Sequence, residues 1–348
     1  MEKKNFENFI TKNKSLSLSR FIYENLYSKP HGYYQKKRIG EDFVTSPEIS
    51  QMFGECIAIF LASINRTQKF MNLCDLGPGN GTLVSDLIRT MTKLIKDKLT
   101  FCLYEKSISL SEYQDSILNR YINNKIEVKR INSLKELKKP TFFLCNEFFD
   151  ALPINQYIKK NNFWYEKRIT FFKKKFISIE VPVESRILEN HKKFDNGDIL
   201  EISPLANIYL KQMFRKISNL GGGALIFDYG PFQKKNISTL QAISKRKKVD
   251  FLNVPYDADI TYHIDFQHIK KLASEFSLIT YGPISQKKFL YYYGINERYQ
   301  MLKNCVSDQK SINRLEEQFH RLISSKQMGN LIKCIFISKL PMKTNAFS

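Results

Sequence analysis

The most specific arrangement of chemistry-bearing residues in this 348-residue chain is LCDLGPGNGTL, at positions 73–83. A short apolar run ends at Asp75, and Gly77, Gly79 and Gly81 follow before a helical pattern begins. Glycines at this spacing turn the chain tightly, so that backbone amides and a helix start face whatever lies above the strand. The spacing is GxGxG rather than the GxGxxG of dinucleotide-binding loops, and no GxxxxGK[ST] phosphate loop is present. The alternative is a glycine-rich turn without a ligand.

An acidic residue followed by GxGxG is typical of loops that bind the methionyl end of S-adenosylmethionine in Rossmann-like methyltransferases. Glu105 supports this interpretation, because it ends the second apolar run, where a doubly wound fold places an acid for the ribose hydroxyls. A lone acidic residue exposed to solvent is the alternative. By position, we expect Asn132 and Ser133 at the adenine edge of the cofactor and Asn146 at its reacting end.

The segment CNEFFDALP, at positions 145–153, follows the fourth apolar run and places Glu147 and Asp150 at the expected reacting centre. Amino-DNA methyltransferases carry an Asn/Asp-Pro-Pro-aromatic motif here, and this chain lacks both prolines. Two carboxylates suit a cationic acceptor, because they can hold a guanidinium in a bidentate manner. We expect Glu147 to orient the acceptor, with Asp150 or Asp228 assisting; caps or salt bridges of the following loop are the alternative.

The elements that must position these residues alternate between apolar runs and helical stretches. A helix is predicted from Thr82 to about Lys96, with one apolar face (Leu83, Leu87, Met91 and Leu94). Buried strands are predicted at 71–77, 100–105, 126–131, 141–149 and 221–230. This alternation predicts an α/β, doubly wound, mostly parallel sheet covered on both faces.

Three regions depart from the alternation. Residues 15–64 have helical patterns in two pieces, the second opened by Thr45, Ser46, Pro47 and Glu48 as cap, first-turn proline and acid. Residues 154–183 alternate apolar and polar side chains around an Asn-Asn turn, which predicts an antiparallel insertion, and a last strand is predicted at 333–338. We therefore expect an N-terminal helical cover (1–70), a core (71–150 and 201–340) and a β-rich insertion on the substrate side (151–200).

The composition gives a net charge of +21, from 55 basic and 34 acidic residues. Such a charge suits a nucleic-acid partner, but only 13 of the basic residues are arginine, so a lysine-rich bias of composition is the favoured explanation. Only residues 234–248 form a dense basic segment.

The six cysteines include no CxxC pair and no histidine at metal spacing, which predicts a reducing compartment and no metal. The chain contains no run of 18 consecutive apolar residues, so no membrane-spanning helix is predicted.

Taken together, these motifs resemble the MidA family of S-adenosylmethionine-dependent methyltransferases, whose mitochondrial members assist assembly of respiratory complex I. The resemblance runs from about Ser17 to Ser338. It is carried by HGYY (31–34), DFVTSPEISQMFGE (42–55), LGPGNGTL (76–83), NEFFDALP (146–153), EISP (201–204), GGGALIFDYG (221–230), DITYHIDF (259–266) and MGN (328–330).

The resemblance implies a seven-stranded methyltransferase sheet and methylation of an arginine side chain in a protein partner, such as a respiratory complex subunit. It implies that residues 45–48 lie over the cofactor, and that Asp228, Asp259, His263 and Asp265 border the acceptor side. A nucleic-acid methyltransferase and a non-catalytic assembly factor that binds S-adenosylmethionine are the alternatives.

The chain departs from the family pattern at Asn80, where arginine is usual, and over residues 239–250. Because the resemblance begins within about twenty residues of Met1, we expect a bacterial cytoplasmic member rather than a mitochondrial matrix protein with a cleaved presequence.

Overall fold

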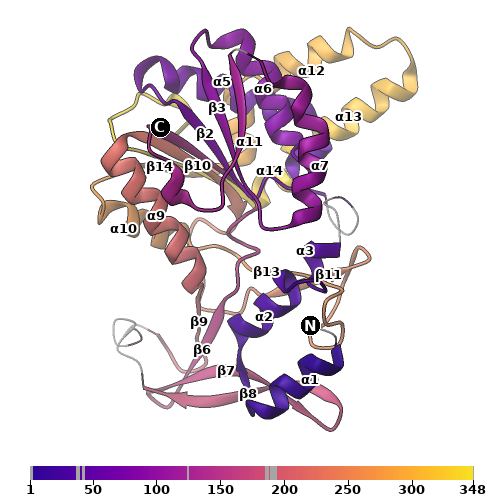
Figure 1. The fold of residues 1–348 in the computed structure, drawn as a ribbon, viewed down its shortest axis with the longest axis vertical. Coiled ribbons are helices and arrows are strands. Elements are labelled where there is room, and N and C mark those ends of the chain that lie inside the picture. Colours follow the sequence, from indigo (N-terminus) through magenta and orange to yellow (C-terminus); the bar gives the residue numbers. More distant parts are fainter. Residues whose placement is uncertain are drawn as a thin grey trace.

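The structure is a computed structural model, and it describes residues 3–36, 40, 44–123, 125–184, 188 and 194–347. Asp42 and Phe43, which open the DFVTSPEIS segment, lie outside the described residues, as do residues 185–187 and 189–193 of the expected insertion. Figure 1 shows a larger body of sheet and helices that contains the C-terminus. A smaller β-rich part, beside the N-terminal helices, extends from it along the long axis.

The larger body is built on a seven-stranded sheet, as expected. Its strands, in order across the sheet, are β14 (Ile279–Ser285), β15 (Ile332–Ser338), β10 (Gly222–Tyr229), β5 (Thr141–Asn146), β2 (Asn72–Leu76), β3 (Leu99–Tyr104) and β4 (Ile126–Arg130). Strands β10, β5, β2, β3 and β4 pair in parallel, whereas β15 is antiparallel to both of its neighbours. The carboxyl ends of the parallel strands therefore meet at one edge, where a ligand site is expected.

Strand β5 is shorter than the predicted strand 141–149. It ends at Asn146 because Glu147 has a left-handed backbone, with φ of 50°, which an extended strand cannot contain. The turn that follows carries the acidic segment out of the sheet, so the early end of the strand exposes the side chains expected to do chemistry.

Helices cover both faces of the sheet (Figure 1). One face packs against α5 (Gln51–Thr67), α6 (Thr82–Leu94), α7 (Ile108–Leu118) and α11 (Gln286–Tyr292), and the other against α9 (Pro204–Leu220) and α10 (Phe266–Ser274). Successive side chains of β2 point to opposite faces of the sheet and so divide the core into two clusters. Leu73 packs in the cluster with α5 and α6, and Cys74 in the cluster with α9 and α10. The predicted helix 82–96 is confirmed, but Leu94 in its last turn is 44% exposed rather than buried.

The start of the second helical piece of the N-terminal cover differs from the prediction. Residues 46–49 form the short helix α4 (Ser46–Ile49), and the chain turns at Ser50 before α5 begins. Thr45 precedes α4 but makes no capping hydrogen bond within the described chain, whereas the hydroxyl of Ser50 accepts the amide of Met52 at 3.4 Å. Thr45 and the short helix α4 are therefore separate from α5 rather than the first turn of one long helix.

The predicted insertion forms the antiparallel sheet of the smaller part. Its strands are β1 (Leu16–Ser17), β6 (Asn155–Lys160), β7 (Phe163–Phe172), β8 (Lys175–Val183) and β9 (Ile199–Ile202). Asn161 and Asn162 make the expected turn with φ of 48° and 68°. The helices α1 (Lys3–Lys12) and α2 (Leu18–Tyr27) pack on this sheet through aromatic rings, with Phe21 and Phe176 centroids 5.4 Å apart.

A third sheet joins the two parts and consists of β11 (Gln241–Ser244), β12 (Lys247–Lys248) and β13 (Asp259–Thr261). The remaining helices are α3 (Tyr33–Lys36), α12 (Ile295–Lys303), α13 (Gln309–Ile323) and α14 (Met328–Leu331), with three 3-10 turns at 119–121, 134–136 and 345–347. Among the described helices, none combines the length and the apolar character needed to cross a membrane. All six cysteines are free thiols, and every one except Cys305 is buried.

Candidate active site

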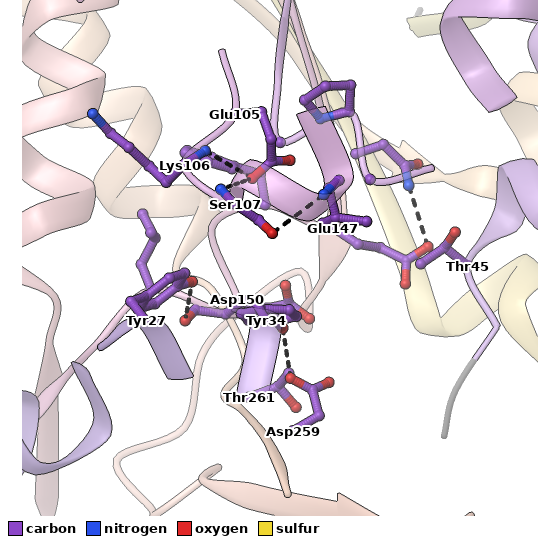
Figure 2. A pocket seen from close by; sticks show the side chains of 18 of the residues that line it. Tyr27, Tyr34, Thr45, Glu105, Lys106, Ser107, Glu147, Asp150, Asp259 and Thr261 are labelled. Carbon is purple, nitrogen blue, oxygen red and sulfur yellow. Dashed lines mark hydrogen bonds between the residues drawn. The ribbon is translucent and has the colours of Figure 1, made fainter. Parts of the chain in front are cut away.

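A cavity of about 720 Å³ lies between the carboxyl ends of the central strands and the N-terminal cover. Its wall combines the loop after β2, the ends of β3 and β5, residues of α2 and α3, and strand β13. Figure 2 shows Glu105 and Ser107 at one end and Tyr34, Asp150 and Asp259 at the other. We call the first end, with the glycine loop and Glu105, the glycine end. The second, with Glu147, Asp150 and Asp259, is the carboxylate end.

The glycine end is shaped by main chain. Gly77, Gly79 and Gly81 have φ of 72°, 55° and 78°, which residues other than glycine rarely adopt. Gly77 and Gly79 line the cavity, whereas Gly81 begins α6 behind it. A Cβ atom on Gly77 would come within 2.8 Å of the Phe148 ring, so this position excludes larger residues twice over.

Buried acceptors at this end lack partners. Within the described part of the chain, Asp75 Oδ2 and Asn146 Oδ1 have no hydrogen-bond partner. Burial, and then the charge of Glu105, raises the pKa of Asp75 to about 8. Glu105 lines the same end and accepts the amides of Lys106 and Ser107 at 2.7 and 2.8 Å. An ammonium group and sugar hydroxyls would satisfy these oxygens, so the residues present fit S-adenosylmethionine.

The segment predicted to lie over the cofactor does border the cavity. Thr45, Pro47 and Glu48 line it, and Glu48 accepts the hydroxyl of Thr82, at the start of α6, at 2.7 Å. Ser46 is buried behind them, and its amide donates to Glu147 Oε1 at 3.1 Å. This short segment therefore links the glycine end to the carboxylate end. From the residue types alone, it was expected only to cap a helix.

Glu147 occupies the carboxylate end in a fixed position. Its Oε1 also accepts Asn146 Nδ2 at 3.3 Å, and its amide donates to the Phe227 carbonyl at 2.8 Å. Burial raises the pKa of Glu147 to about 8 although the bond from Ser46 favours the charged form. The side chain is thus held ready beside the cofactor loop, at a pKa close to neutral pH.

Asp150 and Asp228 take different places from each other. Asp150 lines the cavity, and burial together with Asp228 raises its pKa. Asp228 does not line the cavity: its Oδ2 accepts the amides of Phe149 and Asp150 at 2.9 and 3.3 Å, and its Oδ1 accepts that of Tyr229 at 2.8 Å. The geometry therefore makes Asp228 a clamp on the turn that carries Asp150, rather than a side chain in contact with the acceptor.

The sequence missed two tyrosines at this end. The hydroxyl of Tyr34 donates to Asp259 Oδ1 at 2.5 Å, and that of Tyr27 donates to the Ala151 carbonyl at 3.0 Å. Both rings and Asp259 line the cavity. Tyr34 lies in the HGYY motif, which signalled the family but gave no role for the ring.

Four other expected residues, Asn132, Ser133, His263 and Asp265, lie away from the cavity lining. The amides of Asn132 and Ser133 donate to Glu136 Oε1, both at 2.9 Å, and Ser133 caps the 3-10 turn that follows. Asp265 caps α10 by accepting the amides of Gln267 and His268. For Asn132 and Ser133, the cofactor role stays a prediction.

The carboxylate end gathers acidic side chains, two of which have no basic partner within the described chain. No lysine or arginine of the described chain forms an ion pair with Glu147 or Asp150. Across the described residues, no cluster of His, Cys, Asp and Glu side chains is arranged to hold a metal ion. Ionising buried Asp150 and half-buried Glu147 without a basic partner is costly, and an organic cation entering the cavity would relieve that cost.

Comparisons with known proteins identify the family of this chain. Residues 52–284, about two thirds of the chain, match the family of S-adenosyl-L-methionine-dependent methyltransferases. The chain is similar to the mitochondrial protein arginine methyltransferase NDUFAF7 of Danio rerio, at 30% identity over 354 residues that cover 90% of this chain and 81% of the relative. The human protein of that name is 29% identical over 359 residues, covering 94% and 80%.

Two solved structures from Burkholderia thailandensis share the fold. One is described as a methyl transferase bound to S-adenosyl-homocysteine, with a TM-score of 0.85, 22% identity, and coverage of 99% of this chain and 94% of that chain. The other, a native structure, has a TM-score of 0.85 at 21% identity, with coverage of 99% and 93%. The match to the family and the similarity to its curated relatives establish what the motifs indicated: the chain belongs to the MidA family of S-adenosylmethionine-dependent methyltransferases.

Proposed function

We propose that this methyltransferase methylates the guanidinium group of an arginine in a protein partner. The observation that carries the proposal is the pair of carboxyl groups at this end, half-buried Glu147 and buried Asp150, neither of which has a cationic partner within the described chain. A guanidinium stays protonated at any accessible pH and can bond two carboxylates through its planar fork of N–H groups. Relatives named protein arginine methyltransferase give the proposal independent support.

The chain's own residues would position the acceptor and manage its proton. S-adenosylmethionine, when bound, supplies an electrophilic methyl group on a sulfonium that leaves as a neutral thioether. Glu147, anchored by Ser46, would hold one guanidinium nitrogen beside the glycine end, and Asp150 would hold the opposite side of the group. Glu147 would accept the proton that this nitrogen releases as its bond to the methyl carbon forms, a transfer suited to a pKa near 8.

The proposal also includes the kind of protein partner and the cellular compartment. By family resemblance, the partner is a subunit of a respiratory complex, and the six free cysteines suit the reducing cytoplasm of a bacterium. The basic turn formed by residues 245–248, which includes strand β12, lies on the hairpin whose Gln241 and Ile243 line the cavity. We propose that this turn attracts an acidic surface of the partner.

The test identifies the methylated group directly. The enzyme is incubated with radiolabelled S-adenosylmethionine and an extract of cells that lack its gene, and the products are hydrolysed to amino acids. We expect the label in methylated arginine. Label in methylated lysine or in nucleic acid would overturn the proposal, and absence of transfer would favour a non-catalytic assembly factor.

A pair of variants assigns the step to the carboxylate end. Glu147→Gln preserves the size of the side chain and removes its charge, so we expect turnover to fall by about 100-fold while affinity for S-adenosylhomocysteine changes little. Glu112→Gln, on the exposed surface of α7, is the matched control and should match the wild type. Full activity in Glu147→Gln would contradict the assignment.

A further inference from the structure

Three tyrosines of the N-terminal cover follow one another along the cavity wall. Tyr23, Tyr27 and Tyr34 all line the cavity, and we call them the tyrosine ladder. The ring centroids of Tyr23 and Tyr27 are 5.7 Å apart, and those of Tyr27 and Tyr34 are 5.4 Å apart. Tyr23 is 41% exposed, whereas the other two are half-buried. The ladder therefore runs from the surface to the carboxylate end.

The hydroxyl groups of the two inner tyrosines are already engaged. Tyr27 donates to the carbonyl of Ala151, the residue after Asp150, and Tyr34 donates to Asp259. Burial, and then the charge of Asp259, raises the pKa of both hydroxyls, so both remain protonated donors. Figure 2 shows these rings beside Asp150 and Asp259. With their polar ends fixed, the tyrosines offer ring surface to a ligand, in an orientation set before it arrives.

Ring faces of this kind attract cations, and a planar guanidinium can stack on them while its N–H groups bond carboxylates. The protein itself has such a contact at the outer end of the ladder: Arg20 Cζ lies 5.7 Å from the Tyr23 centroid, and Arg20 pairs with Glu24 at 2.5 Å. At the inner end, Glu147 and Asp150 line the cavity and supply carboxyl groups, which an arriving guanidinium would favour in their ionised form. The whole path thus repeats one combination, an aromatic face next to a carboxylate.

We infer that the arginine side chain of the protein substrate enters along the tyrosine ladder, and that the faces of Tyr27 and Tyr34 select a guanidinium over a lysine ammonium. The inference rests on the proposed function, because it takes arginine as the acceptor. Tyr27 and Tyr34 act in binding and specificity and take no proton. The polypeptide that bears the arginine stays outside, at the level of Tyr23, and only its side chain reaches Glu147.

The test measures selectivity with two small probes. Nα-acetyl-arginine amide and Nα-acetyl-lysine amide are titrated into the enzyme saturated with S-adenosylhomocysteine, and binding is followed by NMR. We expect the wild type to prefer the arginine probe. Tyr27→Leu and Tyr34→Leu, which remove one aromatic face each, should weaken arginine binding by roughly 5- to 30-fold and bring the two affinities together. Tyr34→Phe keeps the face and should keep the preference.

Controls separate this inference from loss of the fold and from the proposed function. Tyr292→Leu, an exposed tyrosine of α11 outside the cavity lining, should leave the preference unchanged, and affinity for S-adenosylhomocysteine should stay within about threefold in all variants. An unchanged preference in both Tyr27→Leu and Tyr34→Leu would overturn the ladder even if methylated arginine is the product. Label in another acceptor would instead overturn the proposed function.

Discussion

The two ends of the cavity are built in opposite ways. The glycine end comes from one contiguous run, Asp75 to Thr82, whose main chain sets its shape through three left-handed glycines. The carboxylate end is assembled from side chains of the N-terminal cover, the turn after β5, the end of β10 and strand β13. One end is therefore defined by backbone geometry, and the other by charge and packing between distant segments.

This difference suggests how the enzyme divides its work. A main-chain site binds the same cofactor whatever the acceptor, because most side-chain substitutions leave backbone geometry unchanged. A side-chain site can be adapted to a particular acceptor by a few substitutions, but it depends on remote contacts such as that between Tyr34 and Asp259. Substitutions at the two ends should therefore affect cofactor affinity and turnover separately.

The largest effect is expected from breaking the glycine end. Gly77→Val forces a branched side chain into a left-handed backbone and against Phe148, so we expect affinity for S-adenosylhomocysteine to fall by about 100-fold in calorimetry. Gly197→Val is the matched control, since Gly197 also has a positive φ, of 92°, but a Cβ there meets nothing within 4 Å. Equal cofactor affinities in the two variants would contradict a main-chain site.

A smaller effect is expected from loosening the carboxylate end. Asp228→Asn places an amide NH₂ against one of the three backbone amides that Asp228 now accepts, so the turn that carries Asp150 should shift. We expect the free energy of unfolding to fall by about 2 kcal/mol and turnover to fall roughly tenfold, with cofactor affinity nearly unchanged.

The control for this variant is Asp265→Asn. Asp265 also accepts two backbone amides, but at the start of α10 and outside the cavity lining, where asparagine is an equally good cap. Stability and turnover should remain close to wild type. If Asp228→Asn lowered cofactor affinity as much as turnover, the two ends would not be separable.

The same difference explains what the sequence could predict. Asp75 and the three glycines lie at alternate positions of one short segment, so their spacing alone indicated the ligand class, and the alternating elements indicated the sheet. The contact between Tyr34 and Asp259 joins residues 225 positions apart, and no local pattern contains it. Asp228 was expected at the acceptor side because it ends a strand, but the direction of its side chain depends on the turn after β5, which sequence spacing does not specify.

The protonation of Glu147, at the carboxylate end, should make the stability of the protein depend on pH. Burial raises the pKa of Glu147 to about 8 in the folded cofactor-free protein, from an ordinary value of 4.5. Because the folded pKa is the higher one, folding favours the protonated form. The stability this confers is complete below pH 4.5 and declines as the pH rises toward 8. The free energy of unfolding should fall by about 1.4 kcal/mol per pH unit for this group within that window.

Chemical denaturation of the cofactor-free protein from pH 5 to pH 8 measures this decline. Glu147→Gln cannot ionise, so its stability should fall less steeply than that of the wild type, and the difference should be greatest near pH 8. Glu112→Gln, exposed on α7, should follow the wild type at every pH. Asp75, whose pKa is also about 8, leaves a residual slope in both variants. An unchanged slope in Glu147→Gln would mean that Glu147 is already ionised throughout this pH range, so that its burial does not raise its pKa.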